Sequence, residues 1–219
     1  MCQKAALPEH TRKGKNMSLY LFEDDILFFQ RLLRAEGLYL DELDGDWGPN
    51  TENASQQFER RSEQIRSETR TFDSRSERNI LTLSLKAQRE ARLFLGRVID
   101  GGLIARIISG TRTYAEQNAL FRQGRFGNPW PIVTKARGGY SNHNFGIAWD
   151  IGIFTSDGGY IADGVEYDRV AKIGLSPQIE WGGSWTSIVD KPHYQLQLGI
   201  SVAALREKFE KGDTIEGFA

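Results

Sequence analysis

Two histidines and two aspartates have types and spacing that could support metal chemistry. His143 and Asp150 lie in SNHNFGIAWDIGIF, residues 141–154, whereas Asp190 and His193 lie in DKPH. Asp150 interrupts an apolar run, and a buried carboxylate without a cation or donors costs several kcal/mol. Two imidazoles and a carboxylate form a common zinc-binding set that leaves one position for water. His143, Asp150 and His193 are therefore candidate metal ligands.

The spacing of these residues constrains the backbone that carries them. His143 and Asp150 are seven residues apart, so on an uninterrupted strand they would point to opposite faces. We therefore expect His143 on a turn before the strand, with Gly146 re-aiming the chain. In HYQLQL, His193 shares its face with the two glutamines. This alternation predicts an edge or half-buried strand whose polar face meets a cleft.

Asp190 is a candidate general base. It precedes His193 by three residues, and Pro192 disfavours helix at Lys191, so a turn is expected to hold the pair. A second carboxylate near a metal is the group expected to activate a bound water.

The residue types alone leave other interpretations open. Asp150 could pair with an arginine, and the histidines could be hydrogen-bonded core residues. The sequence has no HExxH helix, no GxSxG elbow and no phosphate-binding loop. The closest approach to a serine hydrolase is Ser141 with His143 in GYSNH, residues 139–143.

Helical and extended segments surround these residues without a regular βαβ order, which predicts an α+β fold. Helical spacing covers 19–35, and Thr51 is a predicted N-cap of a second helix. A charged, serine-rich run from Arg60 predicts a solvated helix face or a linker. Further predicted elements are a helix that Gly101-Gly102 ends, a strand over 103–110, a helix capped by Thr113, and helices over 168–175 and 201–211.

Composition narrows the possible partners. The 219 residues are 39% hydrophobic and carry a formal net charge of −1, so we expect neither nucleic-acid binding nor membrane insertion. Cys2 is the single cysteine, which excludes intramolecular disulfides and thiolate metal clusters. Residues 1–16 are polar and basic and lack the apolar core of a signal peptide. We expect them to be a disordered tail, with either Met1 or Met17 as the start.

Three ordered motifs resemble those of the VanY-like zinc peptidases, which include D-alanyl-D-alanine carboxypeptidases and L-alanyl-D-glutamate endopeptidases. The first is S-x-H-x-x-G-x-A-x-D, from Ser141 to Asp150. The second is ISGTRTYAEQNALF, residues 108–121, and the third is EWGGSWTSIVDKPHYQ, residues 180–195. DSRSERNI, residues 73–80, resembles the endopeptidase branch, and so does aspartate rather than glutamate at position 190.

The resemblance implies a role for each matching residue. It makes His143, Asp150 and His193 the Zn²⁺ ligands and Asp190 the catalytic base. Arg112 would stabilise the oxyanion of the tetrahedral intermediate, as a fixed guanidinium can where negative charge develops. Ser141 and Gln117 occupy positions near the substrate, although Gln117 could equally be a solvent-facing helix residue. Trp181 and Trp185 are expected to pack in the core or the cleft wall.

A weaker resemblance concerns the N-terminal part. DGDWGPNTENASQQF, residues 44–58, is similar to a motif of peptidoglycan-binding domains, with Ser55 where valine is usual. The alternative is a turn and a capped helix without special function. The expected organisation is a tail (1–16), a helical peptidoglycan-binding-like domain (17–62), a linker (63–72) and a zinc peptidase domain (73–219) with a small antiparallel sheet and flanking helices, as in hedgehog and D-Ala-D-Ala peptidases.

These resemblances predict a monomeric peptidoglycan hydrolase that cleaves the L-Ala–D-Glu bond of stem peptides. The expected setting is a phage or prophage endolysin, made in the cytoplasm and released to the wall by a holin. A secreted cell-wall-degrading effector is a second setting. D-Ala-D-Ala carboxypeptidase activity and a zinc-bearing binding module without catalysis are the alternative functions.

Overall fold

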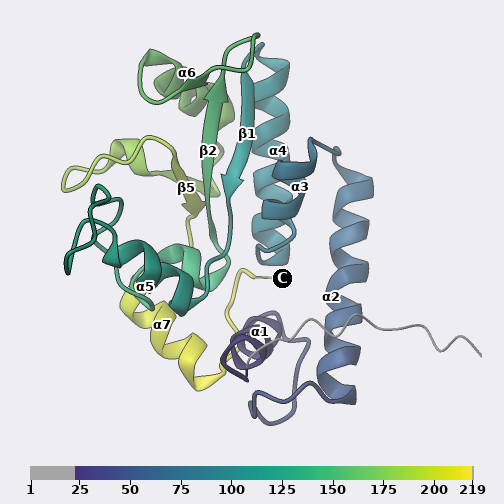
Figure 1. Cartoon of the computed structure of the whole chain (residues 1–219). Coiled ribbons are helices and arrows are strands. Elements are labelled where there is room, and N and C mark those ends of the chain that lie inside the picture. Colours follow the sequence, from purple (N-terminus) through teal and green to yellow (C-terminus); the bar gives the residue numbers. More distant parts are fainter. Residues whose placement is uncertain (1–22, 219) are drawn as a thin grey trace, which may run out of the picture.

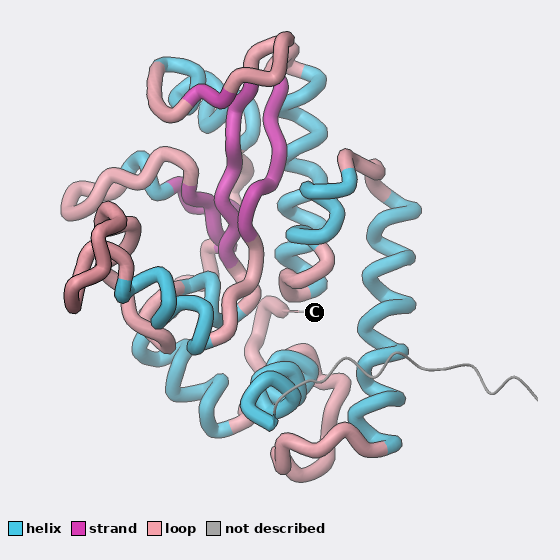
Figure 2. The backbone as a smooth tube through the Cα atoms, in the orientation of Figure 1, coloured by secondary structure: helices cyan, strands magenta, loops and turns pink. Residues whose placement is uncertain are grey.

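The computed structural model of the protein describes residues 23–218 (Figure 1). The predicted tail, 1–16, and residues 17–22 lie outside the described residues. The α+β class is confirmed: helices surround one small antiparallel sheet (Figure 2). Its helices are α1 (Glu23–Ala35), α2 (Pro49–Glu68), α3 (Ser74–Ile80), α4 (Leu85–Asp100), α5 (Tyr114–Arg122), α6 (Val165–Gly174) and α7 (Val202–Lys211), with short 3₁₀ turns η1 (Asn142–Phe145) and η2 (Gly182–Ser184). None of the helices in this part of the chain is both long and apolar enough to cross a bilayer.

The sheet brings distant segments into one row. Its order is β1-β2-β5-β4, and β3 also pairs with β2. The strands are β1 (Ile104–Ser109), β2 (Ala148–Phe154), β3 (Tyr160–Ile161), β4 (Ile179–Trp181) and β5 (His193–Leu196). Antiparallel register places Ser109 opposite Asp150, and Asp150 opposite His193. Directly opposed residues project to the same face, so the row carries these three side chains to one side of the sheet.

The other face of the sheet forms the core with α4. Alternation along β2 directs Trp149, Ile151 and Ile153 to this face, where all three are buried. Phe94 of α4 packs between two strands, with ring centroids 6.1 Å from Trp149 and 4.4 Å from Tyr194. This aromatic packing fixes β2 and β5 side by side, and thereby the two ligand candidates that they carry.

The position of β5 corrects the sequence prediction. It was expected at an edge or half-buried, but it lies between β2 and β4 and all four of its residues are buried. Polar and apolar residues do alternate along HYQL, but both faces of the strand are buried. His193 and Gln195 are buried in a polar site, and Tyr194 and Leu196 in the core.

The N-terminal helices also differ from prediction. Pro49, not Thr51, begins α2, with Gly48 as N-cap, because proline is favoured in the first helical turn. Where a linker was expected over 63–72, residues 63–68 are helical, because α2 continues to Glu68; this agrees with the alternative of a solvated helix face for the charged run. Ile65 explains the extension: it extends the apolar stripe of α2 and packs in a small cluster with Leu33, Tyr39, Ala54, Phe58 and Leu85.

Candidate metal centre

The turn that carries His143 is built around a glycine. His143 lies in η1, and the chain then enters β2 through Gly146, whose φ of +72° is in the left-handed region. A Cβ at Gly146 would lie 3.1 Å from both Leu32 Cδ1 and the Ser84 nitrogen. Glycine is thus required here for two reasons, the left-handed backbone angle and the close packing. As predicted, the chain changes direction here, so His143 and Asp150 can share a site despite their odd spacing.

Three candidate ligand atoms form a nearly equilateral triangle. His143 Nε2 lies 3.2 Å from Asp150 Oδ1 and 3.2 Å from His193 Nδ1, and the last two atoms are 3.3 Å apart. A tetrahedral zinc ion with ligand bonds of about 2.0–2.1 Å has ligand–ligand distances of about 3.3–3.4 Å. The triangle therefore matches one face of such a tetrahedron, and these residues could hold a metal ion.

The hydrogen bonds around His143 fix which nitrogen faces the triangle. The Gly110 carbonyl, 2.7 Å from His143 Nδ1, can only accept, so Nδ1 carries the proton. In the neutral ring this leaves the Nε2 lone pair directed at the triangle, as a metal ligand requires.

A longer chain of hydrogen bonds fixes His193. Gln195 Nε2 donates to a Glu180 carboxylate oxygen at 3.0 Å, which orients the amide so that Oε1 accepts from His193 Nε2 at 3.0 Å. Asn142 Nδ2 also donates to Gln195 Oε1, and Trp185 Nε1 to Glu180. His193 thus presents Nδ1 to the triangle.

Arg112 lies beside the triangle and contacts Asp150, one of its three residues. Its Nη2 donates to Asp150 Oδ2, the carboxylate oxygen outside the triangle. Nε and Nη2 both donate to Ser109 Oγ, at 3.1 and 2.8 Å, and Nη1 lies 3.4 Å from Gln117 Oε1. Asp150 therefore fits both interpretations from the sequence, metal ligand and arginine partner, because one carboxylate oxygen faces the histidines and the other pairs with Arg112.

Burial and charge act against each other in this cluster. Burial disfavours ionisation of Asp150, but His143 and His193 outweigh it and hold the pKa of this carboxyl well below its usual value. Burial lowers the pKa of His143. For His193 burial acts in the same direction, but the hydrogen bond and charge of Asp150 prevail and raise its pKa. An ionised aspartate among imidazoles is the donor set that suits a divalent cation.

Asp190 closes the loop that leads into β5. Its backbone nitrogen donates to the Gly182 carbonyl at 3.0 Å, and its carbonyl accepts from the His193 nitrogen at 3.2 Å. As expected, a turn and not a helix joins Asp190 to His193. Burial, followed by the charge of Asp150, raises the pKa of the half-buried Asp190 carboxyl. That direction suits a proton acceptor, because a base works best with a pKa nearer the working pH.

Two further predicted site residues have different surroundings. Ser141 is the N-cap of η1, and its side chain makes no capping hydrogen bond. Gln117 is fully buried, which rules out the solvent-facing alternative. Its Nε2 donates to Thr134 Oγ1 at 3.3 Å and to the Ala136 carbonyl at 3.0 Å. Gln117 thus ties Arg112 to the loop 134–136.

Sequence reasoning missed the polar residues that support His193. Gln195 lies two residues further along the same face, and this alternation could have identified it. Glu180 has no comparable signal, because it reaches Gln195 from the neighbouring strand β4. The two tryptophans pack as expected: the ring of Trp185 lies 5.0 Å from that of His193, and Trp181 stacks on Tyr194 at 6.4 Å.

The fold and this site define a class of protein. Residues 134–196, which contain His143, Asp150, Asp190 and His193, match the peptidase family described as D-alanyl-D-alanine carboxypeptidase. This match confirms, over these residues, the resemblance to VanY-like peptidases that the motifs indicated.

Two individual proteins are similar to the chain. One is the peptidoglycan L-alanyl-D-glutamate endopeptidase CwlK of Bacillus subtilis (strain 168), 39% identical over 107 residues. The alignment covers 43% of this chain and 62% of CwlK, so the chain spans less than two thirds of that relative. The other is the crystal structure of Serratia marcescens L-Ala D-Glu endopeptidase ChiX, with a TM-score of 0.44 and 26% identity, covering 58% of this chain and 90% of ChiX.

Proposed function

We propose that this protein is a zinc-dependent peptidoglycan hydrolase that cleaves the L-Ala–D-Glu bond of stem peptides. The observation that carries the proposal is the triangle of His143 Nε2, Asp150 Oδ1 and His193 Nδ1, with edges of 3.2–3.3 Å. The similarity to CwlK, whose name states this bond, supports the choice of substrate. Zn²⁺ fits the two nitrogen donors and one carboxylate oxygen better than Mg²⁺ or Ca²⁺, which prefer oxygen ligands.

A zinc ion held there would polarise the scissile carbonyl and lower the pKa of a water molecule. Asp190 is the group that accepts the proton of the attacking water and returns it to the leaving amine. Its raised pKa, caused first by burial, favours both halves of this transfer.

Arg112 serves two ends of the site. It holds Asp150 through Oδ2 and so keeps Oδ1 turned to the histidines. Its hydrogen bonds to residues within 23–218 occupy Nε, both Nη2 protons and one Nη1 proton. The remaining Nη1 proton can donate to the oxygen on which negative charge develops. Gln117 positions Arg112, and Ser141 remains a proposed substrate contact.

The setting of the activity extends the same proposal. Because the proposed substrate lies in the cell wall, we propose that a holin or a secretion system releases the protein to reach it. Peptidoglycan binding by the helical N-terminal part is a further part of this proposal, supported by the motif at 44–58. A monomeric state is also proposed.

The test is digestion of purified muropeptides by the zinc-loaded protein, with mass spectrometry of the new termini. We expect free N-terminal D-Glu and unchanged D-Ala ends. Release of terminal D-Ala alone would replace the endopeptidase assignment by the carboxypeptidase one, which the matched family description names.

Asp190→Asn tests the mechanism in the same assay. We expect kcat to fall by about 100-fold or more while zinc binding persists, because the base is lost and the three ligands remain. Asp163→Asn is the matched control, since the Asp163 side chain is 82% exposed and contacts the Gly164 nitrogen, at 2.7 Å, and Lys191, at 3.9 Å, rather than the triangle. Full activity of Asp190→Asn would show that another group accepts the proton.

A further inference from the structure

Helix α1 presents two apolar faces to different partners. Phe28, Leu32 and Glu36 follow one another at intervals of four, so they lie on one side of the helix and its C-terminal end. Leu32 and Ala35 belong to the core that contains the sheet, whereas Leu33 belongs to the separate cluster with α2. Figure 1 shows α1 between α7 and α2. One face of α1 therefore belongs to the peptidase part of the molecule.

Phe28 reaches the His143 turn through two aromatic rings. Its ring centroid lies 6.1 Å from Tyr114 of α5 and 5.5 Å from Phe209 of α7. Both of these rings contact Phe145, at 6.4 and 5.4 Å. Phe145 is fully buried and stands two residues after His143. The cluster of Phe28, Tyr114, Phe145 and Phe209 thus packs η1 against α1.

Leu32 touches the same turn directly. Its Cδ1 would lie 3.1 Å from a Cβ at Gly146, the residue whose left-handed backbone leads from η1 into β2. Leu32 is 3% exposed, so its contact with Gly146 is part of a closed core. A side chain at position 146 would therefore crowd Leu32, which places this leucine close against the glycine of the turn.

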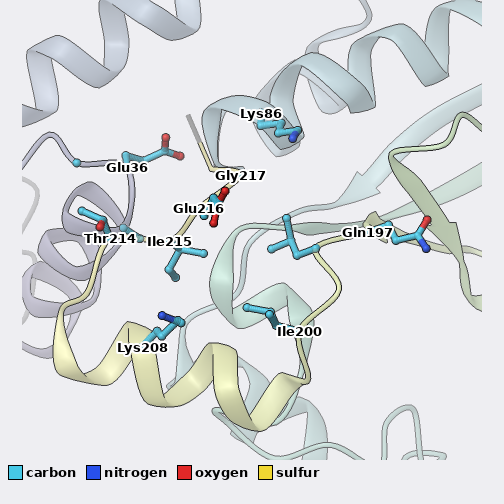
Figure 3. A pocket seen from close by; sticks show the side chains of 12 residues that line it. Glu36, Lys86, Gln197, Ile200, Lys208, Thr214, Ile215, Glu216 and Gly217 are labelled. Carbon is cyan, nitrogen blue, oxygen red and sulfur yellow. The ribbon is translucent and has the colours of Figure 1, made fainter.

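Glu36 and Gly146 meet at the first residues of α4. The Ser84 nitrogen donates to the Gly146 carbonyl at 2.8 Å, and the next nitrogen, of Leu85, donates to Glu36 Oε1 at 2.8 Å. The Lys86 nitrogen donates to the Phe218 carbonyl at 2.9 Å. A cavity of about 790 Å³, lined by Glu36, Lys86 and residues 214–217 among others, lies at this junction (Figure 3). The start of α4 therefore joins α1 to the turn by hydrogen bonds.

We propose that α1 is a positioning element of the metal centre, with Leu32 as its central residue. The inference rests on the proposed zinc site but assigns a role that is separate from wall binding. Phe28, Leu32 and Glu36 hold the η1 turn from behind, so that His143 Nε2 stays at 3.2 Å from Asp150 Oδ1 and His193 Nδ1. Asp150 and His193 are fixed by strand pairing, whereas His143 depends on the turn.

Two adjacent leucines provide the test. Leu32→Ala removes the contact with Gly146, and Leu33→Ala removes an equally buried leucine that faces α2. Both are made in the full chain, and circular dichroism melts establish that each is folded. Leu32→Val and Leu33→Val replace the pair if either alanine variant melts below the assay temperature. Leu32→Met, which conserves volume, should behave as the wild type.

The first measurement is Co²⁺ affinity, obtained by titration of its visible absorption against a competing chelator. We expect Leu32→Ala to weaken binding by about 10-fold or more, the range seen when residues that orient a ligand are changed. Leu33→Ala should bind as the wild type does. Equal weakening in both variants, or in neither, would overturn the proposal.

The second measurement separates this inference from the proposed function. In metal-free protein, the ¹H–¹⁵N imidazole signals of His143 should shift in the Leu32 variant and stay in place in the Leu33 variant. This readout needs neither metal nor peptidase activity. If the wild-type protein binds no metal, the zinc proposal is refuted. The role of α1 is then tested by the imidazole signals alone. Unchanged His143 signals in the Leu32 variant would refute that role.

Discussion

Glu36 makes the stability of this protein depend on pH in an unusual direction. The side chain is 4% exposed, Oε1 accepts from the Leu85 nitrogen at 2.8 Å, and Oε2 has no partner among the described residues. Burial raises the pKa of this carboxyl from 4.5 to about 8, against smaller opposing effects of the Leu85 hydrogen bond and Arg61. The folded chain therefore keeps a proton that the unfolded chain releases.

The sign follows from this difference in proton binding. The stabilisation is fully present below about pH 4.5 and is lost as pH rises through about 8. At about 1.36 kcal/mol per pH unit, the interval from 4.5 to about 8 sets an upper limit of ~5 kcal/mol. Glu36→Gln keeps an acceptor for Leu85 but cannot ionise. It should match the wild type near pH 5 and exceed its stability by several kcal/mol at pH 9.

The assay is urea unfolding at constant ionic strength from pH 5 to 9, with a chelator present so that metal binding does not contribute. Glu216→Gln is the matched control, because Glu216 lines the same cavity but is exposed. It should follow the wild-type curve throughout. Parallel curves for wild type and Glu36→Gln over the whole range would refute the reasoning, since they would mean that Glu36 ionises alike in the folded and unfolded chain.

Two more predictions concern buried polar partners. Gln195→Leu removes the acceptor for His193 Nε2, so zinc affinity measured by chelator competition should fall by about 10–100-fold. The control Gln197→Leu changes an exposed glutamine and should retain the wild-type affinity. Equal affinities in the two variants would show that Gln195 does not orient the ring. Arg92→Met leaves Glu77 without the paired bonds from Nη1 and Nη2, at 2.8 and 2.6 Å, and should lower the free energy of unfolding by about 3–5 kcal/mol in urea titrations. Arg92→Met with Glu77→Gln should recover part of that loss, and a cost below about 1 kcal/mol for Arg92→Met alone would contradict the prediction.

Local rules predicted the elements around the site well. The Thr113 cap is confirmed as a capping box with Glu116, and Gly146 does turn the chain into β2. Gly101 ends α4 where the glycine pair indicated. These features depend on residues within a few positions of one another, so the sequence pattern contains their physical cause.

Features that depend on distant partners were not predictable in the same way. The sequence does not say that β4 covers the outer edge of β5, so His193 was expected on a more exposed strand. Gln117 appeared equally able to face solvent, because its partners are Arg112 and the irregular loop 134–136. The apolar residues of α1 predicted a helix, but its two faces and their separate partners required the tertiary structure.

The start of α4 has a consequence for how the chain folds. Its first amides bind Gly146, Glu36 and Phe218, which lie far from α4 in the sequence and far from one another. Contacts between such distant segments slow folding, because the chain entropy of bringing them together is lost before the bonds form. During synthesis, the Lys86 amide cannot reach its carbonyl partner until residue 218 has been made. We therefore expect the support behind His143 to be among the last parts of the protein to form, which would delay completion of the His143 site until the nascent chain extends at least that far.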